Sequence, residues 1–211
     1  MKERHIPVLV HEICGLLALR QGMVCADLTA GDGGHSEEIL KLIGPKGRLV
    51  AVDQDSEALL RAKDGLKSYE HQIQFINSNF RRASAIEDQA GIKAVDAVLM
   101  DLGVSTLQLG SPARGFAIQY SGPLDMRMDT SLGVTARDIV EGFPEEDLAS
   151  IIYIYGEERR SRAIAKRIVE LRKRKSFETT KDLALCVEQV ARGKGYERIH
   201  PATRVFQALR I

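Results

Sequence analysis

The sequence predicts an α/β fold built on a small parallel sheet of about four strands, joined to a mostly helical region. In the first hundred residues, short and continuously apolar runs alternate with segments of helical period, which is the pattern of parallel strands covered by helices on both faces. After residue 101 the strand pattern stops, and beyond a stretch with several glycines and prolines only helical periodicity remains. We therefore expect two parts in the chain.

The expected elements of the first part alternate along the chain. The apolar runs predict strands over 23–29, 48–52, 73–76 and 95–100. The helical periods predict helices over 8–19, 36–43, 56–66 and 83–90. Ser36 is expected to cap the second helix, which carries acids in its first turn and is followed by Gly44 and Pro45.

The second part is expected to begin with residues 102–133, which lack periodicity and are predicted to be mostly loop. Helices are predicted over 145–155, 157–175, 180–191 and 204–211. Because four strands make a small open sheet, we expect the sheet to continue in sequence not present here. The predicted domains are 1–104 as the N-terminal part of the sheet domain, 105–199 as a helical insertion, and 200–211 as the start of a helix returning to the first domain.

Composition excludes several classes of protein. The chain has 211 residues, of which 44% are hydrophobic and 28% charged, as in globular proteins that bury a core without disulfides. Its three cysteines are scattered, and its histidines show no metal-ligand spacing, so we expect neither a disulfide framework nor a metal. No apolar run approaches the ~20 residues of a membrane span, and the N-terminus lacks the apolar stretch of a signal peptide. We expect a cytoplasmic protein with no membrane partner.

The most informative segment is a glycine-rich turn at 27–36, between the first strand and the next helix. Glycines there let the backbone approach a ligand and present N–H groups at a helix N-terminus. Asp53 ends the second strand, 22 residues after Gly31, where a carboxylate can accept both hydroxyls of a ribose. The pattern predicts a nucleoside-binding crevice, and the alternative is a tight turn without a ligand.

The turn departs from the dinucleotide fingerprint. Its third small residue is Ser36, where the fingerprint has Gly or Ala, and Asp32 lies inside the loop. An acid would repel a pyrophosphate but suits a sulfonium cation, which favours S-adenosylmethionine over a nicotinamide dinucleotide.

Two further strand ends carry candidate residues. Phe80 follows the third strand, where it can stack on a purine or pack in the core. Asp101 follows the fourth strand, where it can contact the cofactor, accept a proton from an attacking amine, or cap a turn.

Positive charge is concentrated between 159 and 175, although the whole chain has a net charge of only +1. This segment has one acid, Glu170, and a net charge of +8. The predicted RNA-binding residues are Arg159, Arg160, Lys166, Arg167, Arg172, Lys173, Arg174 and Lys175, and Arg162 belongs to the same run. Such asymmetry indicates contact with phosphates, and the alternative is a solvated helix face.

A set of short motifs runs in order along the chain: His5-Ile-Pro-Val-Leu9, Gly33-Gly-His-Ser36, Val52-Asp-Gln-Asp55, Asn79-Phe-Arg81, Met100-Asp-Leu-Gly-Val-Ser105, Gln108-Leu109, Arg114-Gly-Phe116, Gly122-Pro-Leu-Asp-Met-Arg-Met-Asp129, Tyr155-Gly-Glu-Glu158, Glu178-Thr-Thr180 and the stretch 200–211. These motifs closely resemble those of the RsmH (MraW) family of bacterial small-subunit rRNA methyltransferases. The Gly-Pro-Leu-Asp-Met-Arg-Met-Asp octamer is highly specific. Family members continue past residue 211, so the chain corresponds to roughly the first two thirds of such a protein.

The resemblance implies a Rossmann-like S-adenosylmethionine-dependent methyltransferase sheet with a helical substrate-recognition insertion. It implies methylation of the N4 amino group of a cytidine in the decoding centre of 16S rRNA, with an assembled or nearly assembled small subunit as partner, and is compatible with a homodimer. By matching position, the cofactor-binding residues would be Gly33, Gly34, His35, Asp53, Phe80, Asp101 and Gln108.

The nucleophile of that reaction needs help, because the lone pair of a cytosine N4 is delocalised into the ring. Asp101 is the candidate acceptor of an N4 proton, through its carboxylate or its backbone carbonyl. Asp125 and Asp129 are weaker candidates, because they can instead form an ion-pair cluster with Arg127. Two alternatives stay open: a truncated, catalytically incompetent fragment that retains RNA or partial cofactor binding, and a nucleotide-dependent oxidoreductase.

Overall fold

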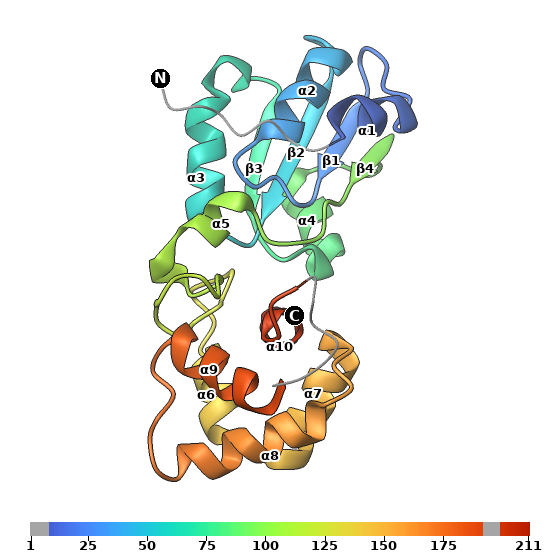
Figure 1. Ribbon diagram of the computed structural model, residues 1–211. Helices are drawn as coiled ribbons and strands as arrows, with labels where there is room; N and C mark the ends of the chain where they lie inside the picture. The colour runs from blue at the N-terminus through green and yellow to red at the C-terminus, as the bar shows by residue number, and fades with distance from the viewer. Residues whose placement is uncertain (1–8, 192–198) are drawn as a thin grey trace. The chain divides into compact units, whose positions relative to one another are not determined.

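The computed structural model describes residues 9–191 and 199–211 (Figure 1). The chain divides into two compact units, Met1–Gly103 and Val104–Ile211. Residues 5–8, which include most of the first family motif and the predicted start of the first helix, lie outside the described part. Within that part, no helix combines the length and the apolar character that a bilayer crossing requires.

The first unit contains the predicted parallel sheet. Its strands are β1 (Val24–Asp27), β2 (Arg48–Asp53), β3 (Ile73–Asn77) and β4 (Ala97–Leu99). They are ordered β3-β2-β1-β4 and all pair in parallel. Strand order therefore reverses at β1, and in open α/β sheets ligands bind outside the carboxyl ends of the strands at such a point.

Helices cover both faces of this sheet. They are α1 (Val10–Leu16), α2 (Gly34–Ile43), α3 (Ser56–Gly65) and α4 (Ala83–Ala90), with short 3₁₀ turns η1 (Lys67–Tyr69) and η2 (Phe80–Arg82). Successive residues of β2 alternate between two cores, as the pleat requires. Leu49 and Ala51 join α2 and α3, whereas Val50 and Val52 join α4 on the other face (Figure 1). The predicted fold class is confirmed.

The second unit is helical. Its elements are α5 (Thr106–Gly110), η3 (Pro112–Arg114), α6 (Ala136–Gly142), α7 (Glu145–Gly156), α8 (Ser161–Arg172), α9 (Thr180–Ala191) and α10 (Thr203–Arg210). One core joins them, with Phe116 and Phe206 fully buried at 0% exposure. Val205, Phe206 and Leu209 of α10 belong to this core. That residues 200–211 begin a return to the first domain stays a prediction.

The helix predicted over 157–175 is shorter in the structure and occupies Ser161–Arg172. Glu157 adopts a left-handed conformation, with φ of 52°, and ends α7. Its carbonyl accepts a hydrogen bond from Arg204 at 3.0 Å. Glu158 is 2% exposed and accepts the backbone N–H of Arg160. Contacts with a distant part of the chain therefore stop a helix that the local sequence favours.

The segment predicted as loop, 102–133, is largely irregular but ordered by side chains. The Arg114 guanidinium donates to the carbonyls of Arg127 and Met128 at 3.1 and 3.0 Å. It also lies 5.6 Å from the centre of the Phe116 ring. The prediction missed α5, although Ser105 and Gln108 form a capping box that is visible in the sequence.

Candidate functional site

The glycine turn after β1 needs its glycines for two different reasons. Gly31 and Gly33 have φ of 53° and 85°, which other residues rarely adopt. A Cβ at Gly33 would lie 2.9 Å from Leu66 Cδ1 and 3.2 Å from Ala62 Cβ, so this glycine allows α3 to pack against the turn. A Cβ at Gly31 would meet nothing closer than 3.9 Å. Gly31, which was not among the predicted contacts, therefore borders open space, whereas Gly33 borders a helix.

Asp53 lies at the carboxyl end of β2, as predicted, and faces this turn. Its two carboxylate oxygens accept the backbone N–H groups of Gly31 and Asp55, each at 2.8 Å. Burial is the largest influence on its pKa, which is raised, and the two hydrogen bonds oppose that shift. A carboxylate has about four acceptor positions, so roughly two remain for a ligand. This arrangement suits the two hydroxyls of a ribose.

Asp101 lies beside the turn, at the point where strand order reverses. Leu28 donates to the carbonyl of Leu99 at 2.9 Å, and the Thr29 hydroxyl accepts the backbone N–H of Asp101 at 2.7 Å. The Asp101 side chain is 64% exposed and lies 4.0 Å from His35 Nδ1. The structure therefore brings two predicted site residues together at the carboxyl edge of the sheet.

Asp32 does not present the free charge that the sequence suggested. Arg61 on α3 donates to its carboxylate at 2.6 Å, and the two charges offset one another. The argument that Asp32 repels a pyrophosphate is therefore weakened by a partner that the sequence did not reveal.

The three remaining cofactor candidates are divided between the two units. Phe80 begins η2, is half-buried, and belongs to neither hydrophobic core of the first unit, which favours an accessible role over a core role. Gln108 is buried in the second unit, where its side chain accepts the backbone N–H of Ser105 at 2.9 Å. Gly34 is the first residue of α2. The cofactor roles of all three stay predictions.

Asp27 is a buried carboxylic acid at this site that the sequence analysis did not single out. It ends β1 with 0% exposure. Its carboxylate accepts hydrogen bonds from the Ser36 hydroxyl at 2.7 Å and from the backbone N–H of Thr29 at 3.2 Å. Burial raises its pKa from 3.8 to about 6. Asp27 thus ties the end of β1 to the first turn of α2.

We expect Asp27→Asn to change the pH dependence of stability. The pKa of Asp27 is higher in the folded state than in the unfolded state. The Asp27 carboxyl group therefore contributes most to stability below pH 3.8, and this contribution is lost as the pH rises to about 6. Between pH 4 and pH 7 the free energy of unfolding of the variant should gain up to about 3 kcal/mol relative to wild type. Urea denaturation of both proteins at a series of pH values checks this. Parallel curves would show that Asp27 is not buried as described.

The predicted RNA-binding cations divide into two groups. Four have structural partners: Arg160 donates to Ala191 O, Arg167 to Gln189, Arg172 to the carbonyls of Val140 and Phe143, and Lys175 pairs with Asp182. Five are exposed, and their side chains make no hydrogen bond or ion pair with any described residue, namely Arg159, Arg162, Lys166, Lys173 and Arg174. The second group is free to bind phosphate, whereas Arg172 anchors the end of α6.

Asp125 and Asp129 have local partners. Arg127 donates to the two carboxylate oxygens of Asp125 at 2.8 and 2.7 Å, and this interaction lowers the pKa of Asp125. Asp129 accepts from the backbone and hydroxyl of Ser131. The expected ion pair of Arg127 is confirmed for Asp125.

Residues 9–191 and 199–211 contain no cluster of three potential metal ligands.

Comparison with known proteins gives consistent matches. The model of the MraW methylase family matches residues 2–211. A protein of Carboxydothermus hydrogenoformans named ribosomal RNA small subunit methyltransferase H is 46% identical over 211 residues, which are 100% of this chain and 67% of that protein. A protein of the same name from Geotalea uraniireducens is 44% identical over 98% of this chain and 67% of its own length. The chain therefore spans about two thirds of the length of these relatives.

Solved structures resemble the chain less closely. A SAM-dependent O-methyltransferase from Thermotoga maritima matches with a TM-score of 0.34 and 17% identity, over 37% of this chain and 32% of that one. Similarity at this level carries no functional weight.

Proposed function

The chain belongs to the MraW methylase family, and we propose that it transfers a methyl group from S-adenosylmethionine to the RNA of the small ribosomal subunit. The finer proposal is methylation of the N4 amino group of a cytidine in the decoding centre of 16S rRNA, in the cytoplasm. The relatives named above support the RNA substrate, and the family motifs of the sequence support the site of methylation.

One observation supports the cofactor site more than any other. Asp53 is held by Gly31 and Asp55 with acceptor capacity left over, beside a turn whose Gly31 borders open space. In this proposal Asp53 accepts the ribose hydroxyls and Phe80 lies near the adenine. Gly33, Gly34 and His35 form the turn near the amino-acid part of the cofactor, and Gln108 is a further contact.

S-adenosylmethionine supplies a methyl group on a sulfonium, which is open to in-line displacement. The protein has to place the attacking nitrogen in line with that methyl group, at about 3–3.5 Å. Asp101 is the proposed acceptor of the N4 proton, because its carboxylate is accessible and its backbone is fixed by Thr29. Reaching N4 in a structured RNA requires the base to be unstacked, so a single-stranded or splayed target is expected.

Labelled methyl transfer tests the function. The 211-residue chain is incubated with small subunits and S-adenosylmethionine carrying a labelled methyl group, and the rRNA is digested to nucleosides. The expected product is N4-methylcytidine, identified by mass spectrometry. A labelled product of another kind would overturn the N4 assignment. Binding of the cofactor without transfer would favour the alternative of a catalytically incompetent fragment.

We expect the five unpartnered cations near α8 to dominate the salt dependence of RNA binding. Changing Lys173 and Arg174 to Gln should reduce the slope of log K against log salt concentration by about 0.7–0.9 for each phosphate that the protein no longer neutralises. Fluorescence anisotropy with rRNA fragments over a range of salt measures the slope. The double variant Lys46→Gln/Lys93→Gln is the control, because both lysines are exposed in the first unit. Equal slopes for the two double variants would remove Lys173 and Arg174 from the interface.

A further inference from the structure

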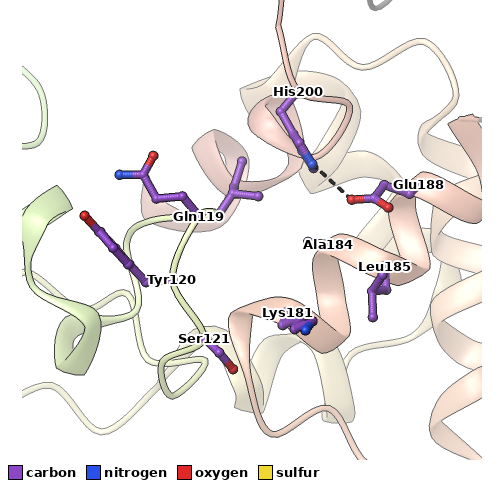
Figure 2. A pocket seen from close by; sticks show the side chains of 9 residues that line it. Gln119, Tyr120, Ser121, Lys181, Ala184, Leu185, Glu188 and His200 are labelled. Carbon is purple, nitrogen blue, oxygen red and sulfur yellow. Dashed lines mark hydrogen bonds and ion pairs between the residues drawn. The ribbon is translucent and has the colours of Figure 1, made fainter.

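A pocket of about 290 Å³ lies wholly within the second unit, apart from the site described above (Figure 2). One wall is α9, which contributes Lys181, Leu185 and Glu188. The opposite wall is the segment 118–121, and His200 closes one end. This volume is just below the range of small-molecule sites, which suits a ligand as small as one nucleotide.

The wall formed by 118–121 is fixed in place. Thr180, at the start of α9, is fully buried. Its hydroxyl donates to the carbonyl of Tyr120 at 2.6 Å and accepts the N–H of Gly122 at 3.2 Å, while its own N–H donates to the carbonyl of Gly122 at 2.9 Å. The two walls are thereby joined by three hydrogen bonds, so the pocket exists before any ligand binds.

Hydrogen bonds show which atoms of His200 and Glu188, at the end of the pocket, donate and which accept. Ala202 donates its N–H to His200 Nδ1 at 3.1 Å, so Nδ1 is an acceptor. The proton of the ring is therefore on Nε2, which donates to one carboxylate oxygen of Glu188 at 3.0 Å. The other carboxylate oxygen of Glu188 has no partner among the described residues. It is an anionic acceptor available to a ligand.

Lys181 supplies the opposite charge. It lies in the first turn of α9, where a cation opposes the helix dipole, and no described residue pairs with its ammonium group. Helix stability therefore does not explain why a lysine occupies this position. Binding of a phosphate at the mouth of the pocket would explain it.

The charge of the unit favours RNA over protein as the partner. Residues 104–211 carry 18 Lys and Arg against 14 Asp and Glu, a net charge of +4, whereas residues 1–103 carry 12 against 15, a net charge of −3. Tyr120 is 41% exposed, and its ring extends from the wall on the side away from α9 (Figure 2). An exposed aromatic ring is a common stacking platform for single-stranded RNA.

We propose that this pocket binds one nucleotide of the single-stranded RNA segment that carries the methylated base, an inference that rests on the function proposed above. The base lies against Leu185 and donates an exocyclic amino group to Glu188, and its phosphate pairs with Lys181. The neighbouring base stacks on Tyr120. Because Glu188 is an acceptor, the pocket prefers bases that carry an amino group, such as cytosine, over uracil.

Binding of labelled hexacytidylate and hexauridylate to the whole chain, measured by fluorescence anisotropy, tests this proposal. Wild type should bind hexacytidylate about fivefold more tightly than hexauridylate. Glu188→Gln keeps an acceptor for His200 and should abolish that preference. Lys181→Glu should weaken binding of both oligomers about tenfold and reduce the salt slope by about one. Leu185→Trp should weaken binding by filling the pocket, without changing the slope.

Lys46→Glu is the matched control, because it reverses the charge of an exposed lysine outside both proposed sites. Lys181→Arg keeps the positive charge and should bind both oligomers as wild type does. Circular dichroism of each variant separates misfolding from loss of the pocket, and Lys181→Ala replaces any variant that fails to fold. If Lys181→Glu and Leu185→Trp bind like the control, or if only an acidic peptide binds, the pocket is not an RNA site. S-adenosylmethionine affinity, which these changes should leave intact, shows independently whether the proposed function survives.

Discussion

Replacing Asp53 with Asn is expected to weaken S-adenosylmethionine binding roughly 100-fold. The carboxylate accepts two backbone N–H groups and keeps about two acceptor positions for the ribose. An amide keeps one acceptor oxygen and no charge. Hydrogen bonds to charged groups contribute about 1.5–3 kcal/mol each, so the change removes about 3 kcal/mol of binding free energy. Isothermal titration calorimetry measures the dissociation constant directly.

Asp55→Asn is the matched control, two residues further along the same loop. Asp55 caps α3 by accepting the N–H groups of Glu57 and Ala58, and Asn caps a helix equally well. The control should therefore keep both its affinity and its thermal stability. If the two variants bind S-adenosylmethionine equally, Asp53 does not hold the ribose. If Asp53→Asn melts far below the control, the weaker binding belongs to the turn rather than to the ligand.

Local sequence signals were sufficient to predict the bounds of elements whose own residues determine where they begin and end. The helices predicted over 83–90 and 180–191 have those bounds in the structure, because their apolar residues recur at helical spacing and their ends carry turn or capping residues. The strand predicted over 48–52 is only one residue longer, and its apolar run is buried on both faces.

Long-range contacts account for the largest error. Residues 157–160 are good helix formers, and nothing local predicts that α7 and α8 separate there. The cause lies nearly fifty residues away, where Arg204 hydrogen-bonds to the carbonyl of Glu157. A Cβ at Gly156 would overlap the carbonyl oxygen of the same arginine, so α7 ends where α10 passes close to it.

In the candidate site, too, local features were predictable and long-range contacts were not. Asp53 was predicted because the end of a strand and the spacing from a glycine turn are visible in one sequence. The pairing of Asp32 with Arg61 was not predicted, because Arg61 lies on another helix. Asp27 left a signal that could have been used: an acid that ends a buried strand must find a hydrogen-bond partner, and Ser36 follows within the same turn.

A count of charges likewise cannot show which cations are free. Arg172 and Lys175 belong to the basic run, yet they donate to the end of α6 and to Asp182. Lys173 and Arg174 lie between them and face solvent. The net charge of the segment was therefore a guide to an RNA-facing surface but not to its individual contacts.

The second unit should be destabilised strongly by Gly115→Ala. Gly115 has φ of 70°, and a Cβ there would overlap the carbonyl oxygen of Pro123. That stretch in turn pairs with the start of α9, through Leu124 and Glu178. Left-handed strain and the steric overlap each cost about 1–3 kcal/mol, so the sum is a large part of the stability of a domain. We expect the melting temperature of the helical unit to fall by about 10 °C or more.

Gly133→Ala is the control, because Gly133 is exposed in the same irregular segment and a Cβ there would meet nothing within 4 Å. It should change the free energy of unfolding by less than about 0.5 kcal/mol. Hydrogen exchange followed by mass spectrometry locates the effect: Gly115→Ala should speed exchange in 112–126 and in α9 while β1 and β2 keep their protection, because the two cores are separate. If both variants melt together and exchange alike, the close approach of Gly115 to Pro123 is wrong.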